Sequence, residues 1–377
     1  MSAYYTSMSG MLGFQSAVDT VAHNLANART AGYKASDVQF RDLMTQAMDA
    51  KPKGLGTMSP AAVRVFRQGA LEFSPSPLDA ALSGNGFFVA TDAAGQPAYT
   101  RGGSFRVGPD AAGVRHLTLP DGSRVQGFGA GAAVAADIVL PQGRPPAATT
   151  AIRLLGNVSA ELPVGESTGF LATVYDAAGV GRTFRLTVQR EAGNAWRLTG
   201  SVDGQPAGES LVGSTPDGRF LTPPLGFAGG GVGPFTVSFE SVTLFGGDSD
   251  FASSQDGRAA APVAGYSIAD GGLVLAHFGD GDVQTVAQLA VARVANPQGL
   301  RALNGGMYTL TPESGEAELL TGPNAGVEIL GGMLEQSTTD LAREFTKLIV
   351  FQRGYQANSR AFLVSDQMRE DLNQIIR

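Results

Sequence analysis

Apolar residues recur every seven positions at both ends of this 377-residue chain, and no other feature constrains its fold as strongly. At the N-terminal end the repeat consists of Tyr4, Met11, Val18 and Leu25, interleaved with Phe14 and Val21. Such a repeat forms a stripe along one side of an α-helix that packs against another helix. The sequence therefore predicts an amphipathic helix that stops at Thr30 to Gly32, since glycine suits the left-handed residue that ends a helix.

The C-terminal end carries a matching repeat, consisting of Leu334, Leu341, Leu348, Tyr355 and Phe362. Gly331 and Gly332 precede this segment, and Thr338 to Asp340 offer capping side chains near its start. Two such stripes with no large body to dock on are expected to bury each other, or to pack against other copies of the chain.

The middle of the chain has a different sequence pattern, in which short runs of β-branched and aromatic residues are interrupted by Gly, Pro, Asp and Asn. Thr183 to Val188 and Phe235 to Phe239 are typical of strands, and Asp203-Gly204 is typical of a tight turn. The predicted fold class is therefore mixed and mainly β. It has two nested β domains, with an N-terminal and a C-terminal α-helix pairing as a coiled-coil-like inner domain.

Two linker-like stretches, residues 141–150 and 246–262, indicate the domain boundaries. They predict a terminal helical domain of residues 1–34 and 331–377. A middle β domain of residues 35–150 and 257–330 would enclose an inserted outer β domain of residues 151–256. The first residues lack a basic region followed by a continuous apolar run, and no run approaches the ~18 apolar residues of a membrane span. We therefore expect neither a cleaved signal peptide nor membrane insertion.

Composition argues against several kinds of chemistry. The formal net charge of −7 disfavours binding to a nucleic-acid backbone, and the absence of cysteine excludes disulfides and thiolate nucleophiles. The histidines at 23, 116 and 277 show no metal-binding spacing, and no nucleophile elbow or phosphate-binding lysine loop is present. We expect no enzymatic activity, no catalytic residues, no cofactor and no metal.

Three motifs along the chain indicate one family. The segment from Asn24 to Lys34 (NLANARTAGYK), preceded by His23, resembles the N-terminal signature of flagellar rod and hook proteins, in which Asn is usual in place of His23. The stretch of residues 78–89 (LDAALSGNGFFV) resembles a second block, and residues 352–359 (QRGYQANS) resemble the C-terminal signature. In that signature Gly354 replaces the usual Ala, at a cost of ~1 kcal/mol in a helix interior. A large insertion beginning at Gly156-Asn157-Val158 is similar to that of hook rather than rod proteins.

This resemblance implies a structural subunit of the flagellar hook that polymerises into a tubular, flexible universal joint and transmits torque from the rod to the filament. It also implies a location on the cell exterior, after export without a cleaved signal peptide. The implied partners are other copies of the chain, the distal rod protein, the hook cap, the hook–filament junction protein and the flagellar type III export apparatus. One alternative is another axial protein of the rod and hook. An alternative from a different class is a secreted β-rich enzyme or adhesin that its terminal helices merely oligomerise.

The predicted assembly residues are the two apolar stripes together with polar side chains that would fix their register. They are Tyr4, Met11, Phe14, Val18, Val21, Asn24, Leu25, Asn27, Thr30, Gly32, Tyr33, Leu334, Leu341, Leu348, Gln352, Tyr355, Gln356, Asn358 and Phe362.

Overall fold

The computed structural model describes residues 2–44, 54–321, 324 and 326–375, and the chain divides into two compact units. The first unit comprises Met1–Pro141, Gly265–His277 and Val283–Arg377, and the second comprises Gln142–Ala264 and Phe278–Asp282. Within the described ranges, no helix is long and apolar enough to cross a membrane.

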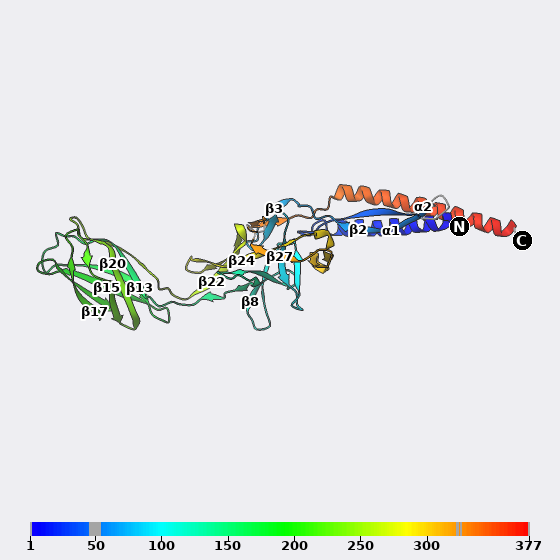
Figure 1. Cartoon of the computed structure of the whole chain (residues 1–377). Helices are drawn as coiled ribbons and strands as arrows, with labels where there is room; N and C mark the ends of the chain where they lie inside the picture. The colour runs from blue at the N-terminus through cyan, green and yellow to red at the C-terminus, as the bar shows by residue number, and fades with distance from the viewer. Residues whose placement is uncertain (1, 45–53, 322–323, 325, 376–377) are drawn as a thin grey trace. The chain divides into compact units, whose positions relative to one another are not determined.

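Two long helices belong to the first unit, α1 (Ser2–Ala26) and α2 (Leu341–Ile375). They lie side by side at the chain termini (Figure 1). They run antiparallel, because Tyr4 near the start of α1 meets Phe362, whereas Asn24 near its end meets Glu344. The prediction of a mainly β chain whose terminal helices contact each other is confirmed.

Both helices are shorter than the sequence predicts. α1 ends at Ala26, and Gly32, with φ of +70°, lies in the following turn, where its N–H donates to the carbonyl of Glu335 at 2.7 Å. The prediction that Leu334 lies on the C-terminal helix is wrong, since Leu334 belongs to strand β29 (Met333–Glu335). This strand pairs with β3 (Leu71–Phe73) instead, and α2 begins only after Asp340, whose Oδ1 accepts from the N–H groups of Ala342 and Arg343.

A two-stranded antiparallel ribbon contacts α1. It consists of β1 (Ser36–Met44) and β2 (Gly54–Arg64). The ribbon therefore adds a third element to the helix pair.

The body of the first unit is built around the long strand β24 (Val283–Val294), which pairs with β5 (Phe87–Thr91), β9 (Arg124–Gly129), β23 (Leu273–Phe278) and β27 (Ala317–Thr321). Its core contains Phe88, Leu117, Leu289 and Val291, all almost fully buried. The other elements are β4 (Ala80–Ser83), β6 (Pro97–Thr100), β7 (Arg106–Pro109), β8 (Arg115–Thr118), β10 (Ala136–Asp137), β11 (Val139–Leu140), β25 (Arg301–Ala302), β26 (Met307–Thr309), β28 (Glu328–Gly331) and the 3-10 turns η1 (Asp270–Gly272), η2 (Pro297–Gly299) and η3 (Asn304–Gly306). Strand β22 (Ala261–Ala269) begins in the second unit and ends in the first.

The second unit contains two sheets that share one core. The first sheet has the order β19-β20-β13-β21 and the second has the order β14-β15-β16-β17-β18. Side chains such as Phe184, Leu198 and Phe235 alternate inward from these strands and are buried. The bounds are β12 (Gly143–Arg144), β13 (Ala151–Asn157), β14 (Ser167–Tyr175), β15 (Gly181–Arg190), β16 (Ala195–Val202), β17 (Gln205–Ser214), β18 (Phe220–Leu221), β19 (Leu225–Gly229), β20 (Val232–Thr243) and β21 (Asp250–Gln255).

Candidate assembly interface

The seam between α1 and α2 is built from aromatic side chains and from close contacts at two glycines, Gly10 and Gly354. The rings of Tyr4 and Phe362 lie 4.5 Å apart, and those of Phe14 and Phe351 lie 6.2 Å apart. At Gly10, an added Cβ would lie 2.7 Å from Oδ1 of Asn358. The two helices therefore touch where Gly10 has no side chain. Of the other predicted seam residues, Val21 is buried, while Met11, Val18, Leu25 and Leu348 are half-buried.

Gly354 is explained by this seam. A Cβ at position 354 would lie 2.5 Å from the ring of Phe14, closer than real side-chain contacts allow. The ring of Phe14 also packs 5.2 Å from that of Phe40 on β1. Glycine at position 354 lowers the helix propensity of α2, but it leaves space for the Phe14 ring between the helices.

Asn24 is fully buried and joins three segments of the chain. Its Oδ1 accepts from the Tyr33 hydroxyl at 3.1 Å and from the Ser36 N–H at 2.9 Å. Its Nδ2 donates to the Ser36 carbonyl at 2.7 Å and to Glu344 on α2 at 3.1 Å. In this structure Asn24 therefore fixes the helix pair within one chain.

Asn27 and Thr30 make only local bonds. The Asn27 amide donates to the His23 carbonyl at 2.9 Å, and the Thr30 hydroxyl donates to Asn27 at 3.2 Å. Both side chains close the turn that follows α1.

Three charged side chains form a buried cluster beneath the helix pair. Lys34 Nζ lies 2.6 Å from Glu335, with both side chains fully buried, and Arg101 lies 3.5 Å from the same carboxylate. Lys34 also donates to the Arg67 carbonyl at 2.7 Å, and Glu335 accepts from the Gly69 N–H at 2.7 Å. Burial lowers the pKa of Lys34 below 10.5, although the hydrogen bond and charge of Glu335 oppose that shift. This cluster ties the chain after α1 to the chain before α2.

Sequence reasoning missed this cluster. Lys34 appeared only as the last residue of a motif, and Glu335 was not singled out. The signal that could have found it is the placement of one cation and one anion beside the two terminal repeats.

Four predicted assembly residues of α2 remain exposed. Leu341 is 49% exposed and Tyr355 is 39% exposed, and Gln352 and Gln356 are also exposed. The last three, with Gln15 and Val18 of α1, line an open hollow of about 380 Å³ between the helices.

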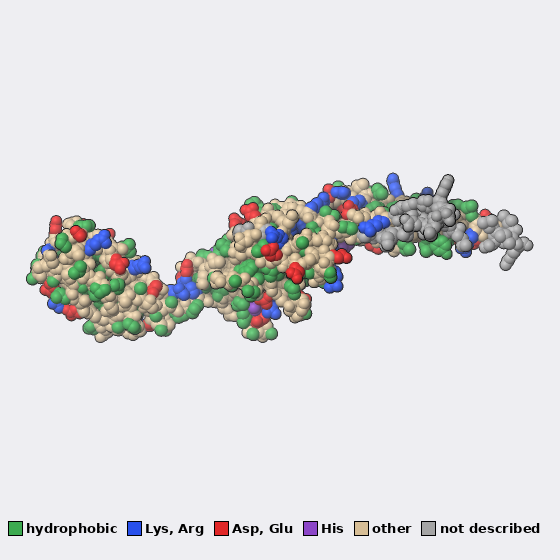
Figure 2. All heavy atoms as spheres, viewed as in Figure 1, with side chains coloured by type: hydrophobic (Ala, Val, Ile, Leu, Met, Phe, Trp, Pro, Cys, Tyr) green, Lys and Arg blue, Asp and Glu red, His purple; other side chains and the backbone are tan. Residues whose placement is uncertain are grey.

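A larger set of exposed apolar side chains, which point away from the seam, was also missed. Apolar side chains reach the surface of the helix pair in Figure 2. We call this set the outer face of the helix pair, and its members, each 49–62% exposed, are Tyr5, Leu12, Leu341, Phe345, Ile349, Val350, Leu363, Val364 and Met368. The four-residue spacing of Leu341, Phe345 and Ile349 was its sequence signal, but the heptad stripe includes only Leu341 of these three.

The described part of the chain presents no group of His, Asp and Glu side chains that could hold a metal ion.

Comparison with known proteins gives three matching family models. "Flagella basal body rod protein" matches residues 5–34, "Flagellar hook protein FlgE/F/G D1 domain" matches residues 81–160, and "Flagellar basal body rod FlgEFG protein C-terminal" matches residues 330–375. The two terminal models therefore coincide with α1 and its following turn, and with α2.

Full-length relatives are similar along almost the whole chain. The flagellar hook protein FlgE of Rhizobium meliloti is 31% identical over 97% of both chains. That of Salmonella typhimurium is 25% identical, over 98% of this chain and 99% of its own. The crystal structure of the Helicobacter pylori flagellar hook protein FlgE2 matches 69% of the present chain and 99% of its own. The TM-score is 0.56 at 13% sequence identity, which shows a shared fold. On these similarities the chain belongs to the flagellar hook protein family and is a structural, non-enzymatic subunit of the hook, a component of the flagellum outside the cell.

Proposed function

We propose that this chain polymerises through the outer face of its helix pair into a tubular, flexible universal joint that transmits torque from rod to filament. The observation that carries the proposal is the exposure of apolar residues on helices that already bury a seam against each other. Phe345 is 50% exposed and Ile349 is 53% exposed on α2, while Leu12 is 58% exposed on α1. Exposed apolar patches of this kind mark protein interaction sites.

Burial of that face supplies the driving force for polymerisation. Each Å² of apolar surface removed from water contributes ~25 cal/mol, and every subunit in a polymer repeats the contribution. Gln352 and Gln356 lie exposed beside the apolar face, and they supply hydrogen bonds that fix the register between copies. Asn358 contributes less to this, since its amide already donates to the Gly354 carbonyl at 2.9 Å.

The proposal includes the three-part plan of a helical inner domain (residues 1–34 and 331–377), a middle β domain (35–150 and 257–330) and an inserted outer β domain (151–256). It also includes export through the flagellar type III apparatus and contacts with the distal rod protein, the hook cap and the hook–filament junction protein. Family membership supports these partners, because a hook joins a rod at one end and a filament at the other.

Two substitutions, one on the outer face and one outside it, test the proposal. Ile349→Asp places a charge on the outer face, where burial of an unpaired carboxylate between copies costs several kcal/mol in each subunit. We expect polymerisation to fail in sedimentation and electron microscopy, while the thermal unfolding of the monomer hardly changes, because position 349 is exposed in the single chain.

Arg301→Asp is the control, since it introduces the same carboxylate at an exposed position that is already polar, on β25 and outside the outer face. We expect the control to form tubes. Tubes from Ile349→Asp of the same calibre and yield as the wild type would show that the outer face is not the interface.

A further inference from the structure

One aromatic side chain protrudes from the body of the first unit. Phe73 on β3 is 89% exposed, more than any other large apolar side chain in the described ranges. Its backbone is held firmly, because β3 pairs with β29 and the next residue, Ser74, donates its N–H to the Gly332 carbonyl at 2.8 Å. A rigidly presented aromatic ring loses little conformational entropy on binding and is typical of interface hot spots.

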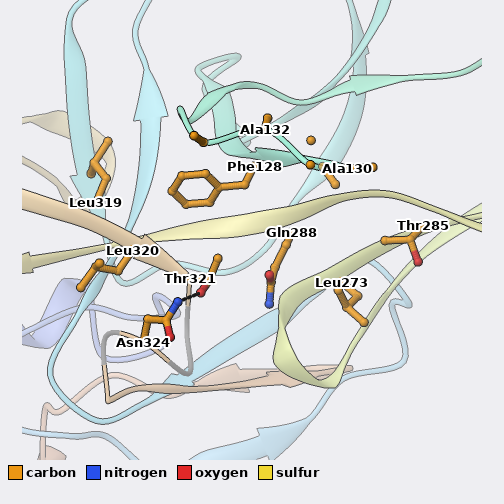
Figure 3. A pocket seen from close by; sticks show the side chains of 14 residues that line it. Phe128, Ala130, Ala132, Leu273, Thr285, Gln288, Leu319, Leu320, Thr321 and Asn324 are labelled. Atoms are coloured by element: carbon orange, nitrogen blue, oxygen red, sulfur yellow. Dashed lines mark hydrogen bonds between the residues drawn. The ribbon is translucent and has the colours of Figure 1, made fainter.

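The same unit has an open apolar hollow of about 510 Å³. Figure 3 shows Phe128 of β9, Leu273 of β23 and Leu320 of β27 around it. The turn after β9 places Ala130 and Ala132 on its rim, so small side chains keep the hollow open. A cavity of roughly 150 Å³ already suffices to hold benzene.

Three of the four polar side chains that line this hollow, Gln288, Thr321 and Asn324, already make hydrogen bonds within the chain. The Gln288 amide donates to the Gly271 carbonyl at 2.8 Å, and the Asn324 amide donates to the Thr321 hydroxyl at 2.9 Å. The hollow therefore suits an apolar group such as a phenyl ring better than a polar ligand.

We propose that Phe73 of one copy inserts into the Phe128–Leu273–Leu320 hollow of a second copy of this chain. This inference rests on the proposed polymerisation. A polymer that extends without closing needs contacts between two different surfaces of the same subunit, and a protruding ring with a separate apolar hollow provides such a pair. The helix pair drives assembly, whereas this contact joins the bodies of neighbouring copies.

Because the chain contains no cysteine, the contact can be tested directly by disulfide cross-linking between introduced cysteines. The double variant Phe73→Cys/Ala132→Cys is polymerised, oxidised and run on a denaturing gel without reductant. We expect a ladder of covalent oligomers. The cysteine at position 73 of each copy would form a disulfide with the cysteine at position 132 of the next copy. Each single variant and the control pair Val107→Cys/Ala132→Cys, which moves the first cysteine to another exposed apolar position, should run as monomer.

Two results would overturn the contact. One is a monomer band from the double variant even though electron microscopy shows normal tubes. The other is a covalent dimer from Phe73→Cys alone, which would show Phe73 packing on its own equivalent. Tube formation is scored separately, so a wild-type chain that forms no tubes counts against the proposed function and not against this pairing.

If the double variant itself does not polymerise, thiol protection in Ala132→Cys alone decides the question. We expect a maleimide to label Cys introduced at this position at least tenfold more slowly in tubes than in monomer. Equal labelling rates would reject the proposal.

Discussion

The second unit and the helix pair of the first unit bury apolar surface in opposite ways. In the second unit, two sheets enclose Phe184, Leu198 and Val237, each with no measurable exposure. In the helix pair, Phe345 and Ile349 keep half of their surface exposed even though α1 and α2 are in contact. The second unit completes its core within one chain, whereas the helix pair leaves apolar surface exposed in the single chain, which the proposed polymerisation would cover.

This difference means that burial in the second unit contributes to the stability of the single chain, whereas the exposed face of the helix pair contributes to its proposed assembly. The second unit resembles an ordinary domain, whose stability comes from burial in its own interior. The helix pair is held to the rest of its unit by specific polar anchors, the buried Asn24 and the Lys34–Glu335 pair, and by packing of α1 on the β1–β2 ribbon. Substitutions in the two regions should therefore change different measurements.

The largest effect is expected in the core of the second unit. Phe184 packs with ring centroids 5.4 Å from Phe227 and 5.1 Å from Phe235. Phe184→Ala should lower the free energy of unfolding of this unit by about 3–5 kcal/mol, because it leaves a cavity. The chain's single tryptophan, Trp196, is buried in the same core and reports the urea transition by fluorescence.

The control for that experiment is Leu211→Ala on β17 of the same unit. Leu211 is 64% exposed, so its truncation should change the free energy of unfolding by less than about 0.5 kcal/mol. A loss as large as that of Phe184→Ala would contradict the description of the second unit as a closed core.

A smaller effect is expected at the charged cluster. Glu335→Gln keeps an acceptor for the Gly69 N–H but leaves Lys34 and Arg101 buried without their counter-charge. The expected loss is about 3 kcal/mol in the first unit, at the low end of the cost of removing one partner from a buried ion pair. Hydrogen exchange of the amides of residues 33–36 should accelerate, while the urea transition reported by Trp196 stays unchanged.

Glu318→Gln provides the comparison, since Glu318 pairs with Arg293 on the surface, with both side chains more than half exposed. Loss of such a pair should cost at most about 1 kcal/mol. If both variants behave alike, the buried cluster is not what holds the helix pair to its unit.

The smallest effect is expected at Gly354. Gly354→Ala gains about 1 kcal/mol of helix propensity but forces the Phe14 ring to move, and such overpacking typically costs about 1–3 kcal/mol. The free energy of unfolding of the helix pair should therefore fall by about 1 kcal/mol. Thermal unfolding monitored by circular dichroism measures this change.

The smaller side chain in the double variant Phe14→Leu/Gly354→Ala should restore part of that stability. Stabilisation by Gly354→Ala alone would mean that helix propensity, and not the packing of Phe14, dominates at this site.

Local patterns in the sequence were enough to predict much of this protein. The seven-residue repeats predicted both terminal helices, because helical periodicity is a property of a short stretch of chain. Alternating runs such as Thr183 to Val188 predicted the strands for the same reason. The motifs of residues 24–34 and 352–359 indicated the family, which the comparisons confirm.

Only the tertiary structure decided which faces of the helices are buried. Heptad spacing could not show that Phe14 occupies the space above Gly354, or that Leu341, Phe345 and Ile349 remain exposed. It also placed Leu334 on a helix, although pairing with β3 makes it part of a strand. Lys34 meets Glu335 across 301 residues of sequence. Contacts at such separation depend on how whole surfaces fit together, and no local periodicity encodes that fit.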